Sequence, residues 1–142
     1  MKTIAEIQND IVNDFNEIGD PFDQYAYLIE LSCAFVPMYK DMKTPELLVE
    51  GCQSHVWLYI YADENGKFQF DADSDTLIVK GILYLLQKCY CGKSPDEVEK
   101  SEIFFLDRTA IMDTFESDRQ KGIGYVIKKL RYEAGKMRKT CT

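Results

Sequence analysis

The chain has neither an excess of positive charge nor a long hydrophobic run. Its formal net charge of -7 argues against a general nucleic-acid binder, because such proteins neutralise phosphates with Lys and Arg. No stretch approaches the roughly 20 apolar residues of a membrane-spanning helix. No apolar segment of a secretory signal follows residues 1–6. We therefore expect a cytoplasmic protein that binds neither nucleic acid nor membrane.

Cysteine and histidine are few, and their spacing excludes several common sites. The five cysteines are Cys33, Cys52, Cys89, Cys91 and Cys141. An odd number without framework spacing, in a chain with no export signal, indicates reduced thiols. Cys89 and Cys91 are too close together for the usual zinc pair, and no second pair accompanies them. We interpret these two as core thiols at a helix end and expect no metal site.

Length and composition indicate one folded domain over residues 1–142, with 46% hydrophobic and 29% charged residues. The charge is unevenly distributed. Residues 119–142 carry a net charge of +7, so the preceding residues carry -14. This basic segment is either a docking surface or a helix whose C-terminal cations suit the helix dipole, and the second explanation requires no partner.

Helical periodicity predicts helices at both ends of the chain. Apolar residues recur at helical spacing over residues 4–18, and Thr3 with Glu6 forms a capping box in front of them. An N-cap aspartate and a first-turn proline at 20–21 open a second helix that stops near residues 36–37. A further helix is predicted at 76–90, capped by Ser74 or Asp75, and short helical segments are predicted at 94–97, 102–107 and 109–115. A last helix is predicted from Ser117 or Asp118 onward. Its apolar face carries Ile123, Val126, Ile127 and Leu130.

A β-hairpin is predicted in the middle of the chain. Residues 56–61 are rich in aromatic and β-branched side chains, and residues 67–73 alternate polar and apolar across a turn at 63–66. The preceding segment 37–50 is irregular, with either a short strand or a helical turn at 47–49. We therefore predict an α+β domain in which a small antiparallel sheet of about three strands packs against N-terminal and C-terminal helices.

Two further patterns fail as ligand-binding motifs. Gly92 begins a Gly-Lys-Ser run that resembles the end of a phosphate loop, but Gln87 replaces the required glycine and a helix precedes it. Asp71, Asp73 and Asp75 have calcium-loop spacing without the glycine and distal glutamate of such loops. We interpret these carboxylates as solvated turn and helix-cap groups.

The most informative segment surrounds Cys52, which follows Gly51 and precedes the first predicted strand. His55, the only histidine, and Trp57, the only tryptophan, lie within five residues of it. A thiol on a glycine-hinged loop is well placed to meet another protein, although free cysteine is also often a small buried hydrophobe. A cysteine hydrolase is disfavoured, because residues three apart on one strand point to opposite faces. His55 then either tunes the thiol or covers the sheet.

The whole chain resembles the SufE family of sulfur-acceptor proteins of iron–sulfur cluster assembly. The matching segments are residues 27–31, Gly51-Cys52-Gln53-Ser54 with Val56-Trp57, residues 73–75 and 78–81, Tyr90, Gly92, Pro95, Arg119 and Gly122. The departures are His55 in place of Gln or another polar residue, Ser32-Cys33 in place of a Gly-containing pair, and a changed lead-in before Arg119. Arg119 is therefore a less direct match than Cys52.

The resemblance implies a SufE/NifU-like fold and a sulfur-carrying function. Cys52 would accept sulfur as a persulfide from a SufS-like, pyridoxal-phosphate-dependent cysteine desulfurase and pass it to an iron–sulfur scaffold, with no cofactor of its own. Loop support is expected from Gly51, Gln53, Ser54, His55 and Trp57. Partner binding, or contact with the cysteine loop, is expected from Asp75 and Arg119. Apolar shelter for the persulfide is expected from Val56, Trp57 and the hairpin.

Several alternatives stay open at this point. The protein could instead be a cluster scaffold, which requires several convergent ligands, or a regulator that binds the desulfurase without accepting sulfur. Asp75 is equally a candidate helix cap. The sequence leaves open whether the protein is a monomer or a homodimer, whether Cys52 is buried at rest, and what the other cysteines do.

Overall fold

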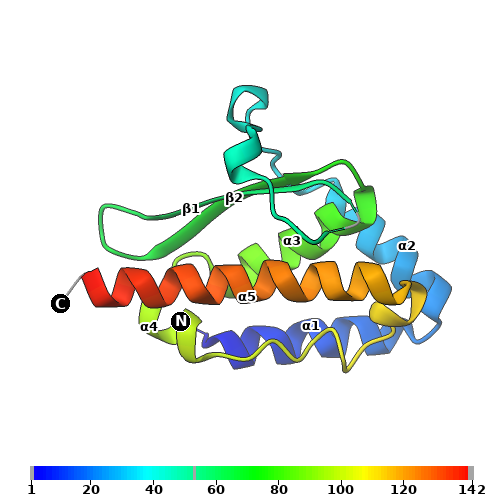
Figure 1. The fold of residues 1–142 in the computed structure, drawn as a ribbon. Helices are drawn as coiled ribbons and strands as arrows, with labels where there is room; N and C mark the ends of the chain where they lie inside the picture. Colours follow the sequence, from blue (N-terminus) through cyan, green and yellow to red (C-terminus); the bar gives the residue numbers. More distant parts are fainter. Residues whose placement is uncertain (1, 53, 141–142) are drawn as a thin grey trace.

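A computed structural model describes residues 2–52 and 54–140, except for the side chain of Thr140. The elements in chain order are α1 (Ile4–Ile18), α2 (Pro21–Ser32), η1 (Lys40–Met42), η2 (Pro45–Leu47), β1 (Val56–Ala62), β2 (Phe68–Ser74), α3 (Leu77–Tyr90), α4 (Pro95–Lys100), η3 (Met112–Thr114) and α5 (Ser117–Thr140). In Figure 1 the hairpin runs along one side of the molecule and α1 along the opposite side, with α3 and α5 between them. The predicted α+β architecture is confirmed.

The two N-terminal helices begin where their capping residues predict. Thr3 accepts a hydrogen bond from the backbone N–H of Glu6, and the Glu6 carboxylate accepts one from the backbone N–H of Thr3. The Asp20 carboxylate accepts from the first N–H groups of α2, directly before a first-turn proline. Such caps satisfy N–H groups that have no partner inside the helix. Helix α2 ends at Ser32, before the predicted residues 36–37, and tight i→i−3 bonds follow it.

The sheet among the described residues has two antiparallel strands rather than about three. Val56 pairs with Ser74, and Ala62 pairs with Phe68 at the turn end. Residues 47–49, predicted as either a short strand or a helical turn, contribute the end of the short helix η2 and one isolated bridge, Leu48 to Trp57. Val56 and Leu58 point into the core, whereas Tyr59 is exposed, as the two-residue period of a strand requires.

Asp73 is buried and paired, in contrast to its interpretation as a solvated carboxylate. Its side chain is 2% exposed and contacts the Lys43 ammonium at 2.6 Å and the Lys80 ammonium at 3.8 Å. The Lys43 ammonium also lies over the Trp57 ring, 5.3 Å from its centroid. Burying a charge requires such partners, so this contact fixes the irregular segment 37–50 against the hairpin.

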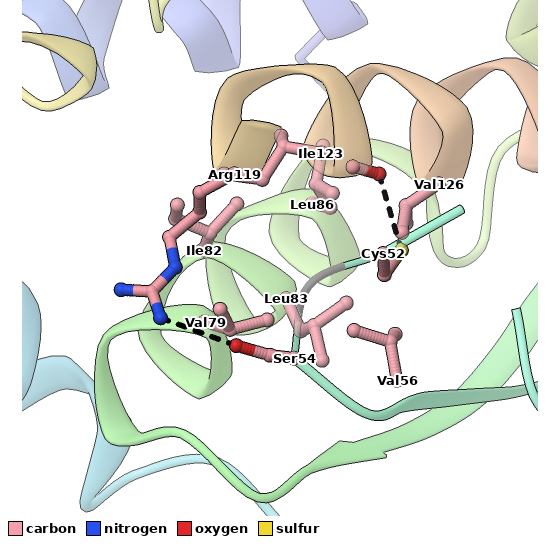
Figure 2. Close-up of a pocket in the computed structure, with 11 residues that line it drawn as sticks. Cys52, Ser54, Val56, Val79, Ile82, Leu83, Leu86, Arg119, Ile123 and Val126 are labelled. Atoms are coloured by element: carbon pink, nitrogen blue, oxygen red, sulfur yellow. Dashed lines mark hydrogen bonds between the residues drawn. The ribbon is translucent and has the colours of Figure 1, made fainter. Parts of the chain in front are cut away.

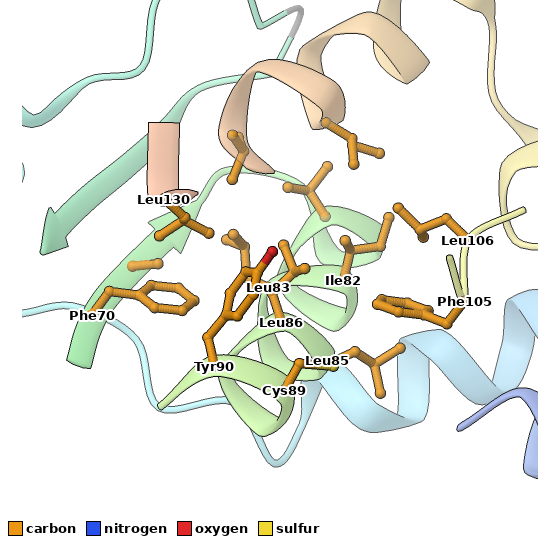
Figure 3. Close-up of a cluster of buried hydrophobic side chains, with 14 of the residues drawn as sticks. Phe70, Ile82, Leu83, Leu85, Leu86, Cys89, Tyr90, Phe105, Leu106 and Leu130 are labelled. Atoms are coloured by element: carbon orange, nitrogen blue, oxygen red, sulfur yellow. The ribbon is translucent and has the colours of Figure 1, made fainter. Parts of the chain in front are cut away.

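The core is centred on α3, which is apolar on most of its surface. Leu83, Leu86 and Tyr90 are at most 1% exposed. Figure 3 shows them between Phe70 of β2 on one side and Phe105 with Leu106 on the other. A helix that is apolar nearly all round is stable only when other elements cover it on several sides, and α3 contacts α1, α2 and β2. This rigid central helix is the floor on which the candidate site is built.

Residues 102–107 do not form the predicted short helix. The buried side chain of Gln8 accepts hydrogen bonds from the backbone N–H groups of Phe104 and Phe105, at 2.7 and 3.1 Å, and donates one to the carbonyl of Glu102. Backbone groups that would otherwise require helical partners are satisfied by this side chain. The segment is therefore a turn, and residues 112–114 form only the short helix η3.

The predicted cap of α3 is also different. Thr76 occupies the N-cap position, without a side-chain cap bond, whereas Ser74 or Asp75 was expected there. Asp75 is engaged elsewhere, as described below. No helix within residues 2–52 and 54–140 is both long and apolar enough to cross a membrane.

Candidate functional site

Cys52 lies on a short loop closed by a backbone hydrogen bond at its neck. The N–H of Val49 donates to the carbonyl of Val56 at 2.8 Å, so the chain on either side of Cys52 is held together at these two residues. Gly51 has a φ of 89°, in the left-handed region that glycine adopts at no steric cost. The backbone at Gly51 therefore turns the chain so that the next residue points toward the protein.

The Cys52 thiol faces an apolar pocket between α3 and α5 (Figure 2). It donates a weak hydrogen bond to the carbonyl of Gly122, with sulfur and oxygen 3.4 Å apart. The other lining residues are Ser54, Val56, Val79, Ile82, Leu83, Leu86, Arg119, Ile123 and Val126. The pocket has a free volume of about 20 Å³, which is enough for about one group the size of a water molecule.

Burial controls the acidity of this thiol. Removal from water disfavours the thiolate and raises the pKa of Cys52 above its ordinary value. The resting loop therefore holds Cys52 as a protonated, weakly nucleophilic thiol near neutral pH.

This raised pKa predicts slow alkylation of Cys52 at neutral pH in the folded protein. The folded chain should hold the Cys52 proton to a higher pH than the unfolded chain, whose thiol titrates near 9.0. By linkage, Cys52 contributes to the stability of the folded chain while the pH is below the ordinary thiol pKa. This contribution is lost as the pH rises through the raised pKa of the folded chain. The measurement is the iodoacetamide reaction rate of the Cys52 peptide from about pH 6 to pH 11, in folded and in guanidinium-unfolded protein. Equal midpoints would contradict the buried resting thiol.

Arg119 and Ser54 connect the loop to the first turn of α5. The Arg119 guanidinium donates to the Ser54 hydroxyl at 3.3 Å, and the Thr76 hydroxyl donates to the same oxygen at 2.9 Å. The guanidinium also lies over the Phe115 ring, 5.8 Å from its centroid. The buried Nε of Arg119 has no hydrogen-bond partner among the described residues. The structure thus brings two residues of the sequence-predicted site, Ser54 and Arg119, together with Cys52.

His55 and Trp57 lie on the outer face of the hairpin, away from the pocket lining. The His55 ring stacks on the Trp57 ring with centroids 5.7 Å apart, and its Nδ1 is 2.8 Å from a carboxylate oxygen of Asp75. No hydrogen bond among the described residues joins His55 to the Cys52 thiol. Val56 shelters the thiol as expected, but Trp57 does not, because alternate strand residues point to opposite faces.

Asp75 binds the end of the cysteine loop instead of capping α3. Its carboxylate accepts a hydrogen bond from the backbone N–H of His55 at 3.2 Å, and its own N–H donates to the His55 carbonyl at 3.3 Å. Partial burial is the largest single effect on the pKa of Asp75 and raises it, but the hydrogen bonds to His55 and Thr76 and the charge of His55 together lower this pKa below its ordinary value. Asp75 therefore anchors the loop where it enters β1.

The pocket includes residues that the sequence pattern did not assign to the site. Gly122 supplies the carbonyl acceptor, and an added Cβ at this position would lie 3.1 Å from the Cys52 Cα. Val79 and Leu83 of α3 form the opposite wall. The helical spacing of Ile123 and Val126 marked them as a buried face, but nothing local in the sequence indicated what that face would cover.

The other described cysteines are in different environments. Cys33 is exposed at the C-cap of α2. Burial raises the pKa of Cys89 to about 12 and that of Cys91 to about 11, consistent with core thiols at the end of α3. Gln53 and Cys141 lie outside the described residues. Within the part of the chain that is described, no three His, Cys, Asp or Glu side chains are grouped to hold a metal ion.

Residues 9–134 match the family model described as SufE, an Fe-S metabolism associated domain. The chain belongs to the SufE family. A SufE-like protein of Rhizobium etli, described as uncharacterized, is 33% identical over 128 residues, covering 87% of this chain and 86% of the relative. The SufE resemblance of the sequence is thereby confirmed, and with it a role in Fe-S metabolism.

The SufE chain also has a similar solved structure. The solution structure of a hypothetical protein from Thermus thermophilus matches with a TM-score of 0.75, covering 94% of this chain and 96% of that one. The two sequences are 18% identical, so this likeness concerns the fold alone. It supports the arrangement of hairpin and helices that places Cys52 against α5.

Proposed function

We propose that this protein accepts sulfur on Cys52 as a persulfide from a cysteine desulfurase and carries it toward iron–sulfur cluster assembly. The observation that carries the proposal is the placement of Cys52. Its thiol is held on a glycine-hinged loop at an apolar pocket with room for about one further small group. Membership of a family associated with Fe-S metabolism supports the same function.

The transfer is a thiol exchange in which atoms and electrons balance. The Cys52 thiolate attacks the outer sulfur of a persulfide on the desulfurase. A new S–S bond forms at Cys52 while the S–S bond of the donor breaks, and the desulfurase cysteine leaves as a thiolate. The step needs no external oxidant or reductant. The partner supplies the pyridoxal phosphate that removes sulfur from free cysteine, and this chain contributes its thiol.

The pocket suits the storage of the transferred sulfur. A persulfide exposed to solvent is open to attack by other thiols. The walls contributed by Leu83, Ile123 and Val126 are apolar and belong to two packed helices. When the loop closes again after transfer, these side chains exclude water and competing thiols from the outer sulfur.

Transfer requires the loop to leave its resting position. The resting thiol is half-buried and faces the pocket between α3 and α5, so we expect the loop to open before a protein-sized donor aligns its own sulfur with Cys52. Gly51 provides the backbone freedom for this movement. Asp75 and Arg119 bind the loop at His55 and Ser54, and we expect them to contact the partner where the loop opens.

The first test is the mass of the protein after incubation with a cysteine desulfurase and free cysteine under non-reducing conditions. We expect one or more added sulfur atoms on the peptide that contains Cys52. The peptide that contains Cys89 is an internal control, because this thiol is buried and its pKa is raised. An unmodified Cys52 peptide, with a partner that is active on cysteine, would contradict the proposal and favour a regulator that binds without accepting sulfur.

A further inference from the structure

Tyr125 of α5 covers the glycine at the start of the cysteine loop. A methyl group added at Gly51 would lie 2.7 Å from both Cδ2 and Cε2 of the Tyr125 ring, closer than non-bonded carbons approach. The ring is therefore packed directly on the backbone of Gly51. The contact is made by ring carbons, so it depends on the aromatic ring of the side chain and not on its hydroxyl.

The same helix holds the loop at a second point, one residue further along the loop. The Cys52 thiol donates to the Gly122 carbonyl, and the Cys52 Cα lies so close to Gly122 that a side chain there would crowd it. Gly122 and Tyr125 are three residues apart, so they lie on neighbouring turns of one helix face. Together they hold Gly51 and Cys52 against α5.

Tyr125 has space into which it can move. The residue is 46% exposed, and an open groove lies beside it, lined by Gly51, Cys52, Asp118, Lys121 and Tyr125 itself. A large aromatic side chain left half in water next to a groove is not required by the core. Rotation of the ring away from Gly51 would remove one of the contacts that hold the loop closed, without disturbing the packing of α5 on the rest of the protein.

We infer that Tyr125 is a positioning residue that latches the cysteine loop in its closed, thiol-protecting state. This inference rests on the proposed function, because it assigns to Tyr125 the control of the opening step that sulfur transfer requires. A docking partner that displaces the ring from Gly51 would couple docking to release of Cys52. Closure after transfer returns the ring to Gly51 and the sulfur to the pocket.

The test compares Tyr125→Ala with Tyr125→Phe in the isolated full chain. Alanine removes the ring but favours helix, whereas phenylalanine keeps the ring contact. We expect iodoacetamide to modify Cys52 about tenfold faster in Tyr125→Ala and at the unchanged rate in Tyr125→Phe, because a sheltered thiol reacts in proportion to its open population. An unchanged rate in Tyr125→Ala, or an equal increase in Tyr125→Phe, would overturn the latch.

Cys89 reports on general loosening in the same experiment. It is 0% exposed in the core, so its alkylation requires opening of the whole structure. A parallel acceleration of Cys89 in Tyr125→Ala would show global destabilisation and would overturn the latch. An acceleration confined to Cys52 supports it.

Sulfur loading separates the latch from the proposed function. If opening limits docking, Tyr125→Ala should lower the apparent KM for the desulfurase, by up to about the same tenfold factor, with little change in kcat. Failure of the wild-type protein to accept sulfur would overturn the proposed function, whereas the alkylation rates would still decide the latch. Normal sulfur loading with identical alkylation rates in all three proteins would overturn the latch alone.

Discussion

Serine in place of Cys52 is expected to leave the protein folded but unable to take up sulfur. The hydroxyl is smaller than the thiol and can still donate to the Gly122 carbonyl, which accepts from Cys52 in the wild type. The reaction itself requires a thiolate, since thiolates and not alcohols attack the outer sulfur of a persulfide. We therefore expect complete loss of sulfur labelling, with an unchanged far-UV CD spectrum and melting temperature within a few degrees, as for most near-isosteric changes.

A matched control is available at Cys33. This cysteine is exposed at the end of α2, so Cys33→Ser changes the thiol count without touching the pocket. Sulfur labelling should match that of the wild type. Persistent labelling of Cys52→Ser, or its loss in Cys33→Ser, would refute the assignment of Cys52 as the acceptor.

The same variant separates carrier from regulator. A carrier stimulates the desulfurase by removing its persulfide sulfur, so Cys52→Ser should abolish stimulation while retaining binding. A regulator acts through contact alone, so its stimulation would survive the substitution. Desulfurase turnover measured with each variant distinguishes these two outcomes.

Alanine in place of Gly81 is expected to destabilise the fold by about 1–3 kcal/mol, the usual cost of overpacking. Gly81 lies on α3 where it crosses α2, and an added Cβ would lie 2.4 Å from the backbone carbonyl oxygen of Leu28. A backbone atom cannot rotate away as a side chain can, so the two helices must move apart. Because α3 forms the floor of the Cys52 pocket, this separation should also raise the reactivity of Cys52.

Gly124→Ala is the matched control for this prediction. Gly124 is also a helix-interior glycine, but an added Cβ there meets nothing within 4 Å. Replacing an unconstrained helical glycine with alanine usually stabilises by roughly 0.5–1 kcal/mol. Urea unfolding of both variants should therefore give free-energy changes of opposite sign. A stabilising Gly81→Ala would contradict the close packing of α2 on α3.

Local signals in the sequence were sufficient for most of the secondary structure. The capping box at Thr3 and the Asp20-Pro21 pair locate the starts of α1 and α2. Alternating polar and apolar residues next to a glycine-containing turn locate the hairpin. These signals succeed because caps and periodicity act within a few residues of chain. They fail at residues 102–107, where Gln8, which is distant in sequence, satisfies the backbone.

The sequence predicted which segment carries the candidate site, but not where the side chains of that segment lie in the fold. The glycine before Cys52 and the family motif pointed to the candidate thiol, and the same resemblance pointed to Ser54 and Arg119. The sequence did not separate Trp57, on the outer face of the hairpin, from Val56, which lines the pocket. The resemblance linked Asp75 to the partner surface or the cysteine loop, but the sequence did not decide between contact with the loop, which the structure shows at His55, and a cap on α3.

By itself, then, the sequence determined most of the elements, the family and the cysteine that we propose as the acceptor. The tertiary structure decided that Cys52 rests protonated in a pocket and that α5 holds it there. The bond from Cys52 to Gly122 spans 70 residues, and that from Arg119 to Ser54 spans 65. Contacts of this range depend on how helices pack rather than on any local pattern, because the pocket exists only after α3, α5 and the hairpin have come together around one core.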